Sequence, residues 1–157
     1  MKKENLKALI ISLTVSIGTG IIGGLITYKN MQQYQNLYKP PLSPPSWLFP
    51  IVWTILFFLM GVSAYLIYMS KSEEKKEALK LYALQLLANT VWTIIFFAFE
   101  AYLLAFAWLL LLWYLIYSTY KIFGRINYTA GILFIPYLIW VTFAGYLNFA
   151  ISVHYFF

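Results

Sequence analysis

Residues 39–53 read KPPLSPPSWLFPIVW, a proline-rich segment that leads directly into an apolar, aromatic one. Five of the six prolines of the chain lie in this stretch. Because proline has no amide hydrogen and restricts the residue before it, residues 39–46 cannot begin a helix. Residues 47–68 are then apolar over about 20 positions, the length that crosses a bilayer. The stretch therefore predicts a stiff loop, attached to a membrane helix, that covers a site at the membrane surface.

The composition is that of an integral membrane protein. Of the 157 residues, 62% are hydrophobic and 10% are charged, and the mean hydropathy is +0.75. A soluble domain of this size has too little interior to bury so many apolar side chains. The chain has no cysteine or aspartate, and four of its five glutamates lie in charged flanks, which disfavours ordinary acid–base catalysis. Its only histidine, His154, lies at the carboxyl end, so we expect no metal site.

Five apolar segments predict the fold class, an all-α integral membrane bundle of five transmembrane helices in a single domain, residues 1–157. The segments cover residues 6–27, 47–69, 79–99, 102–123 and 128–152, and residues 28–46 form a proline-rich lid loop. Each segment is close to the roughly 20 residues that a spanning helix needs, and none alternates as a barrel strand does. The short connections make successive helices antiparallel neighbours.

The basic residues predict the orientation. Five spans place the amino terminus, the second loop and the fourth loop on one side, where nine of the eleven basic residues lie. The other side has Lys29 and Lys39 only. The positive-inside rule then puts the amino terminus inside and the carboxyl terminus outside. These cations flank apolar segments and form no stripe, so membrane lipids are the expected anionic partner and nucleic acid is not.

Small residues recur every four positions in the first helix, at Ser12, Ser16, Gly20 and Gly24. This spacing lets helix backbones approach closely. It fits packing within the bundle or a seam between two copies of the chain, and packing within the bundle is favoured.

Polar and aromatic residues share faces on three other helices. Gln85, Asn89 and Trp92 fall within about 60° of arc on the third helix. Amides in hydrocarbon are costly unless paired, so they should face the interior, either to bond other helices or to contact a ligand. Aromatic faces also occur around Trp53 and around Trp140, with Pro136 one turn before Trp140. Such faces are more often core or lipid belt, but a kink at Pro136 can open a cavity.

Three blocks of sequence resemble the translocator protein family, also called tryptophan-rich sensory proteins or peripheral-type benzodiazepine receptors. Residues 39–53 resemble the family signature, residues 85–97 its third-helix motif and residues 136–148 its fifth-helix motif. The resemblance implies a five-helix membrane protein, commonly a homodimer, with no required cofactor. Its implied ligands are protoporphyrin IX, other haem-like tetrapyrroles, and hydrophobic small molecules of the benzodiazepine and isoquinoline carboxamide types.

The resemblance also implies the site. The family's ligand contacts correspond by motif to five residues beneath the lid loop: Trp53, Asn89, Trp92, Trp140 and Ala144. To these we add Pro136, because a kink at this residue can open a cavity. We therefore predict a pocket between the second, third and fifth helices.

Three functions fit these predictions. The first is a receptor or sensor for porphyrins and drug-like ligands. The second is an enzyme that degrades protoporphyrin with light and oxygen, in which Trp53 and Trp140 are the catalytic electron donors. The third is a tetrapyrrole transporter, although no internal repeat of the kind that supports alternating access is visible. The expected location is a bacterial plasma membrane, with the amino-terminal apolar run retained as a helix.

Overall fold

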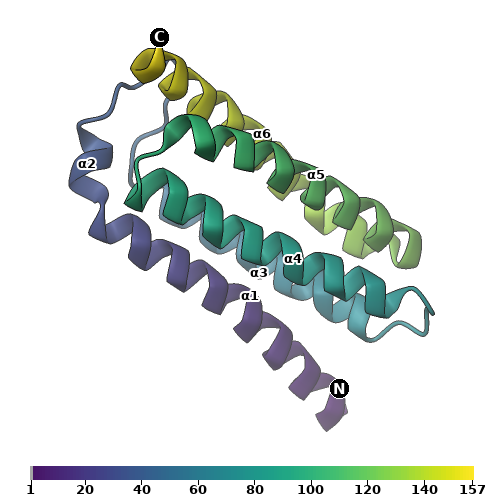
Figure 1. Cartoon of the computed structure of the whole chain (residues 1–157). Helices are drawn as coiled ribbons and strands as arrows, with labels where there is room; N and C mark the ends of the chain where they lie inside the picture. Colours follow the sequence, from purple (N-terminus) through teal and green to yellow (C-terminus); the bar gives the residue numbers. More distant parts are fainter. Residues whose placement is uncertain (1) are drawn as a thin grey trace.

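The structure is a computed structural model that describes residues 2–157 (Figure 1). Its elements in chain order are α1 (Lys3–Lys29), α2 (Met31–Gln35), α3 (Leu48–Tyr68), α4 (Lys75–Thr93), the π-helical turn η1 (Ile94–Ala98), α5 (Tyr102–Ile126) and α6 (Tyr128–Phe156). Within the described residues, five helices are long and apolar enough to cross a membrane, with α4 and η1 forming one span. The predicted all-α membrane bundle of five helices is confirmed.

Four of the helices, α1, α4, α5 and α6, begin or end beyond the predicted apolar segments, whereas α3 lies within its predicted bounds. α4, for example, begins at Lys75, four residues before its apolar part. The predicted lid loop contains the short helix α2, in a glutamine-rich stretch that precedes the first proline. Residues 39–46 are not helical, as their prolines require. Leu42, between the two proline pairs, has a positive φ of 68°.

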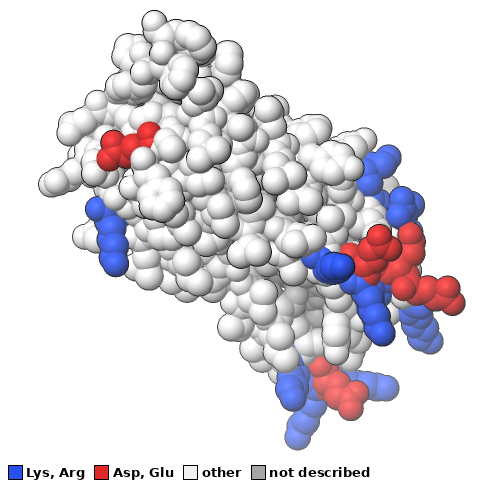
Figure 2. All heavy atoms as spheres, in the orientation of Figure 1, with Lys and Arg blue, Asp and Glu red and all other residues white. Residues whose placement is uncertain are grey.

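The two ends of the bundle differ in charge. The amino terminus, the α3–α4 loop and the α5–α6 turn lie at one end, here called the basic end (Figure 1). The lid loop and the carboxyl terminus lie at the other, here called the lid end. Lys and Arg side chains gather at the basic end in Figure 2, where Arg125 forms an ion pair with Glu74 at 3.0 Å. This is the grouping of loops that the sequence predicted.

The small residues of α1 pack it against α3 toward the basic end. Ser12 donates a hydrogen bond to the carbonyl of Gly61 at 2.8 Å, and Ser16 donates one to the carbonyl of Phe57 at 2.6 Å. A Cβ atom on Gly61 would lie 2.8 Å from Leu13 Cδ2 and 3.1 Å from Leu13 Cα, so glycine here lets the two backbones approach closely. This half of the small-residue stripe therefore packs within the bundle.

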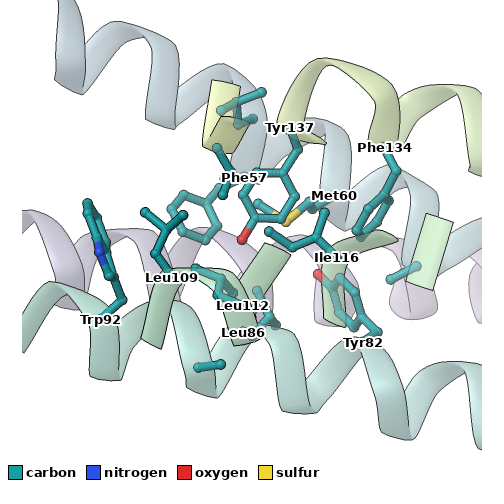
Figure 3. Close-up of a cluster of buried hydrophobic side chains, with 14 of the residues drawn as sticks. Phe57, Met60, Tyr82, Leu86, Trp92, Leu109, Leu112, Ile116, Phe134 and Tyr137 are labelled. Atoms are coloured by element: carbon teal, nitrogen blue, oxygen red, sulfur yellow. The ribbon is translucent and has the colours of Figure 1, made fainter. Parts of the chain in front are cut away.

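A buried polar network joins α4 to α6. Tyr137 is fully buried, and Figure 3 shows it reaching from α6 into the core beside residues of α3. Its hydroxyl donates to Gln85 Oε1 at 2.9 Å and accepts from Asn89 Nδ2 at 2.8 Å. The amide of Gln85 also donates weakly to Met60 Sδ, at 3.6 Å. Both amides thus face the interior as predicted, and each is paired across helices.

We predict that Tyr137→Phe destabilises the bundle by about 1–2 kcal/mol, because two buried amides lose a hydrogen-bond partner. Thermal unfolding in detergent measures the effect. Tyr114→Phe is the matched control, since Tyr114 is 62% exposed on the outer face of α5. Equal unfolding temperatures for the two variants would contradict a structural role for this network.

Candidate ligand-binding site

A cavity of about 420 Å³ opens near the lid end of the bundle. Its walls come from α1, α3, α4 with η1, and α6, and the lid loop contributes Met31, Tyr34 and Ser46. Three tryptophans line it, Trp53, Trp92 and Trp140, and none of its described lining residues carries a charge. The chamber therefore suits an apolar, aromatic ligand rather than an ion.

Five of the six predicted site residues line this one cavity: Trp53, Asn89, Trp92, Trp140 and Ala144. They come from α3, α4 and α6, the three helices between which the pocket was predicted. Their roles in ligand binding stay predictions, but the structure brings their side chains together around a common space.

Pro136 is the sixth predicted site residue, and it lies outside the lining of this cavity, so its role in ligand binding stays a prediction. It is exposed on α6 and does not line the cavity. The reason is its depth, because the lining of α6 begins at Trp140, one helical turn closer to the lid end. Below that turn, Tyr137 fills the interior instead.

Helix α1 forms a wall that sequence reasoning missed. Gly20, Gly23 and Gly24 all line the cavity. A Cβ atom on Gly20 would lie 2.6 Å from Phe57, whereas one on Gly24 would meet nothing within 4 Å. Gly20 therefore lets α1 lie close to Phe57, whereas Gly24 leaves open space that a larger side chain would fill. The available signal was the change from serine to glycine along the small-residue stripe.

The aromatic walls are held by neighbouring rings and by hydrogen bonds. The Trp53 ring lies 6.1 Å from that of Tyr137, edge to face. The Trp92 indole donates to Asn148 Oδ1 at 3.1 Å, and the amide of Asn148 donates in turn to the carbonyl of Tyr102 at 2.9 Å. These contacts fix the orientation of two indoles before any ligand enters.

Trp140 differs from Trp92 because its indole N–H is unpaired. Its ring packs against Phe49 at 5.8 Å and Phe143 at 5.7 Å. The Nε1 atom is buried, yet no acceptor within residues 2–157 bonds to it. Buried indole N–H groups usually have a partner.

The carboxyl-terminal turns of α6 hold the lid loop. The backbone N–H of Tyr38 donates to the Tyr155 hydroxyl at 2.9 Å, and the Tyr38 ring stacks on His154 at 4.1 Å. Nearer the middle of α6, the Tyr146 hydroxyl donates a hydrogen bond to the carbonyl of Pro41 at 2.9 Å. His154 thus contacts the lid loop. Sequence reasoning missed these contacts because they join opposite ends of the chain.

Comparison with known proteins agrees with this architecture. A model of the TspO/MBR family matches residues 10–154. A tryptophan-rich protein TspO of Chlorobaculum tepidum is 39% identical over 149 residues, which cover 90% of this chain and 94% of that protein. A tryptophan-rich sensory protein of Cereibacter sphaeroides is 38% identical, with 90% and 88% covered. A translocator protein of Ovis aries is 35% identical, with 85% and 78% covered. Because the family model spans nearly the whole sequence, this multi-pass membrane protein belongs to the TspO/MBR family.

Proposed function

We propose that the protein is a membrane receptor or sensor that binds porphyrins, such as protoporphyrin IX, and flat hydrophobic drug-like molecules beneath the lid loop. The observation that carries the proposal is the cavity of about 420 Å³, walled by three tryptophans and free of charged lining residues. Ligand pockets are typically about 300–1,000 Å³, mostly apolar, with a few placed polar groups. The names of the relatives, sensory protein and translocator protein, support a receptor role.

The proposed binding mode follows from the walls. A flat ring system packs between Trp53 and Trp140, which face the cavity from α3 and α6. The free indole N–H of Trp140 donates to an acceptor at the edge of the ring. Gly24 on α1 and Ala144 on α6 provide the room, because neither has a large side chain. The lid loop then separates the ligand from water.

We further propose that the protein lies in a bacterial plasma membrane as a homodimer, with its amino terminus inside. The concentration of Lys and Arg at the basic end supports this orientation, because cytoplasmic loops carry an excess of these residues (Figure 2). The lid loop and the cavity mouth would then face the outer side, and ligands would enter from there or from the outer leaflet.

We predict that Trp53→Ala weakens protoporphyrin IX binding about 30-fold, or about 2 kcal/mol, because a large aromatic wall is lost. Titration into protein in lipid nanodiscs measures the Kd, with empty nanodiscs as the blank. Trp47→Ala is the matched control, since Trp47 is 65% exposed and lies outside the cavity lining. Parental affinity in a folded Trp53→Ala variant would rule out this placement of the ligand.

We also predict that Ala144→Phe abolishes measurable porphyrin binding while the bundle stays folded. The new ring would occupy the cavity, whereas the surrounding walls are already fixed by their own contacts. Ile139→Phe adds the same ring to α6 at a position that is 66% exposed, and it should bind as the parent does. Binding isotherms and unfolding temperatures of both variants check this. If Ala144→Phe binds normally, Ala144 only packs the helix.

A second candidate function is light- and oxygen-dependent degradation of the bound porphyrin. The observation that favours it is the position of two oxidisable indoles, Trp53 and Trp140, in the same cavity. Light would excite the bound porphyrin, and the indoles would donate electrons to the excited porphyrin. Dioxygen would be the oxidant in the degradation of the porphyrin. The lid loop would keep reactive intermediates away from water.

For this second function we predict that a Trp53→Phe, Trp140→Phe double variant still binds protoporphyrin IX but makes no product in light. Phenylalanine keeps much of the apolar contact and is far harder to oxidise. Absorption spectra of illuminated and dark samples in air measure product formation. Trp113→Phe, outside the cavity, is the control. Product formation by the double variant at the parental rate would show that the porphyrin acts alone as a photosensitiser.

A further inference from the structure

The cavity reaches the outer surface of the bundle between α1 and α3. Among its described lining residues, those of α4, η1, α6 and the lid loop are all buried or half-buried. The exposed lining residues belong to the other two helices. They are Ile21, Gly24 and Tyr28 on α1, and Pro50 and Thr54 on α3. The opening between these residues is here called the α1–α3 seam.

The packing of α1 explains why the seam is open. A Cβ atom on Gly20 would lie 2.6 Å from the Phe57 ring, so α1 and α3 are in close contact up to this point. One turn further, a Cβ atom on Gly23 would lie 3.8 Å from Thr93 of α4, whereas one on Gly24 would meet nothing within 4 Å. Beyond Gly20, α1 therefore stays near α4, and no side chain of Gly24 fills the seam.

The seam lies at the depth of the hydrocarbon. Trp47 and Tyr28 are exposed at the lid ends of α3 and α1, and such aromatic residues occupy the membrane–water interface. Thr54 and Ile21 lie seven residues from Trp47 and Tyr28, respectively, which is about 10 Å along a helix axis. The seam is therefore presented to the acyl chains of the leaflet at the lid end.

The rim of the seam is apolar at this depth. Ile21 and Pro50 have hydrocarbon side chains, and the Thr54 hydroxyl donates a hydrogen bond to the Pro50 carbonyl at 2.7 Å. The one polar side chain of the rim is thus already paired. A molecule that passes from lipid into the cavity exchanges one apolar environment for another, so it pays no cost for unpaired polar groups on the way.

The route past the lid loop is fastened, in contrast to the seam. The backbone N–H of Tyr38 donates to the Tyr155 hydroxyl. The Tyr146 hydroxyl donates to the carbonyl of Pro41. Opening this route would break both hydrogen bonds. The hydrogen bonds between α1 and α3 in the described chain come from Ser12 and Ser16, on the basic-end side of the seam, so none has to break for a ligand to pass through it.

We propose that the α1–α3 seam is a lateral port through which ligands dissolved in the membrane enter and leave the cavity. The port admits apolar molecules that partition into the bilayer, and they arrive from the leaflet at the lid end. This inference rests on the proposed binding function and adds the side from which the site is reached. The lid loop covers the cavity and does not have to open for a ligand to enter.

The test links the two sides of the port and follows ligand exchange. Because the chain has no cysteine, an Ile21→Cys, Thr54→Cys variant carries two thiols that a reducible, membrane-permeant bismaleimide can join. Transfer of protoporphyrin IX between nanodiscs and vesicles, followed by its fluorescence, measures exchange. Linking the empty protein should slow association about tenfold, and linking the loaded protein should slow release about tenfold. Reduction of the linker should restore both rates.

Two controls separate a closed port from other effects of the linker. Each single-cysteine variant, treated with the same reagent, should exchange ligand faster than the linked protein. A second link, in Tyr38→Cys, His154→Cys, joins the lid loop to α6 at positions whose rings stack at 4.1 Å. It should leave exchange at the parental rate. Parental exchange through a linked seam overturns the inference, and so does exchange that stops only when the lid loop is linked.

A bulky substitution tests the port without a reagent. Thr54→Trp narrows the seam and should slow association and release alike. Ile55→Trp is the matched control, since Ile55 is exposed on α3 but lies outside the cavity lining. Equal rates in the two variants also overturn the inference. In each of these cases, protoporphyrin IX binding by the parent that Trp53→Ala weakens leaves the proposed function standing. If the parent does not bind protoporphyrin IX, the proposed function fails, and the inference fails with it.

Discussion

Polar side chains between these helices have to find their partners inside the protein, because the surrounding hydrocarbon offers none. The Tyr137 hydroxyl shows the consequence most clearly, since it bonds both Gln85 and Asn89 and so ties α6 to α4. Ser12 and Ser16 do the same for α1 and α3 through backbone carbonyls. These bonds join α4 to α6 and α1 to α3 from within the bundle.

The half of the bundle toward the lid end differs, because it contains the cavity. There the small-residue stripe of α1 changes from serine to glycine, and a Cβ atom on Gly24 would meet nothing within 4 Å. Gly20 lets α1 lie close to Phe57, and the missing side chain of Gly24, one turn further on, leaves open space beside the chamber. Within residues 2–157 three buried polar atoms lack a partner, on Ser70, Tyr82 and Trp140, and only Trp140 lines the cavity.

Much of this arrangement can be predicted from the sequence, because spans, faces and charged ends depend on local pattern. Helical periodicity places Trp53, Asn89 and Trp140 on inward faces, and the structure brings them to one cavity. Periodicity does not give depth, so it could not show that the α6 lining of the cavity begins at Trp140, one turn beyond the predicted kink residue Pro136. Nor does it give neighbours in space. The bond between Tyr38 and Tyr155 joins residues 117 positions apart, and no local signal marks it.

The central claim is that the chamber beneath the lid loop is where a porphyrin binds. A structure of the protein with bound protoporphyrin IX, determined in nanodiscs or in a lipidic crystal, tests it most directly. The account predicts density for the ring system enclosed by α1, α3, α4 and α6, in contact with Trp53 and Trp140. Density for the porphyrin on the outer, lipid-facing surface of the helices, with the chamber unchanged, would contradict it.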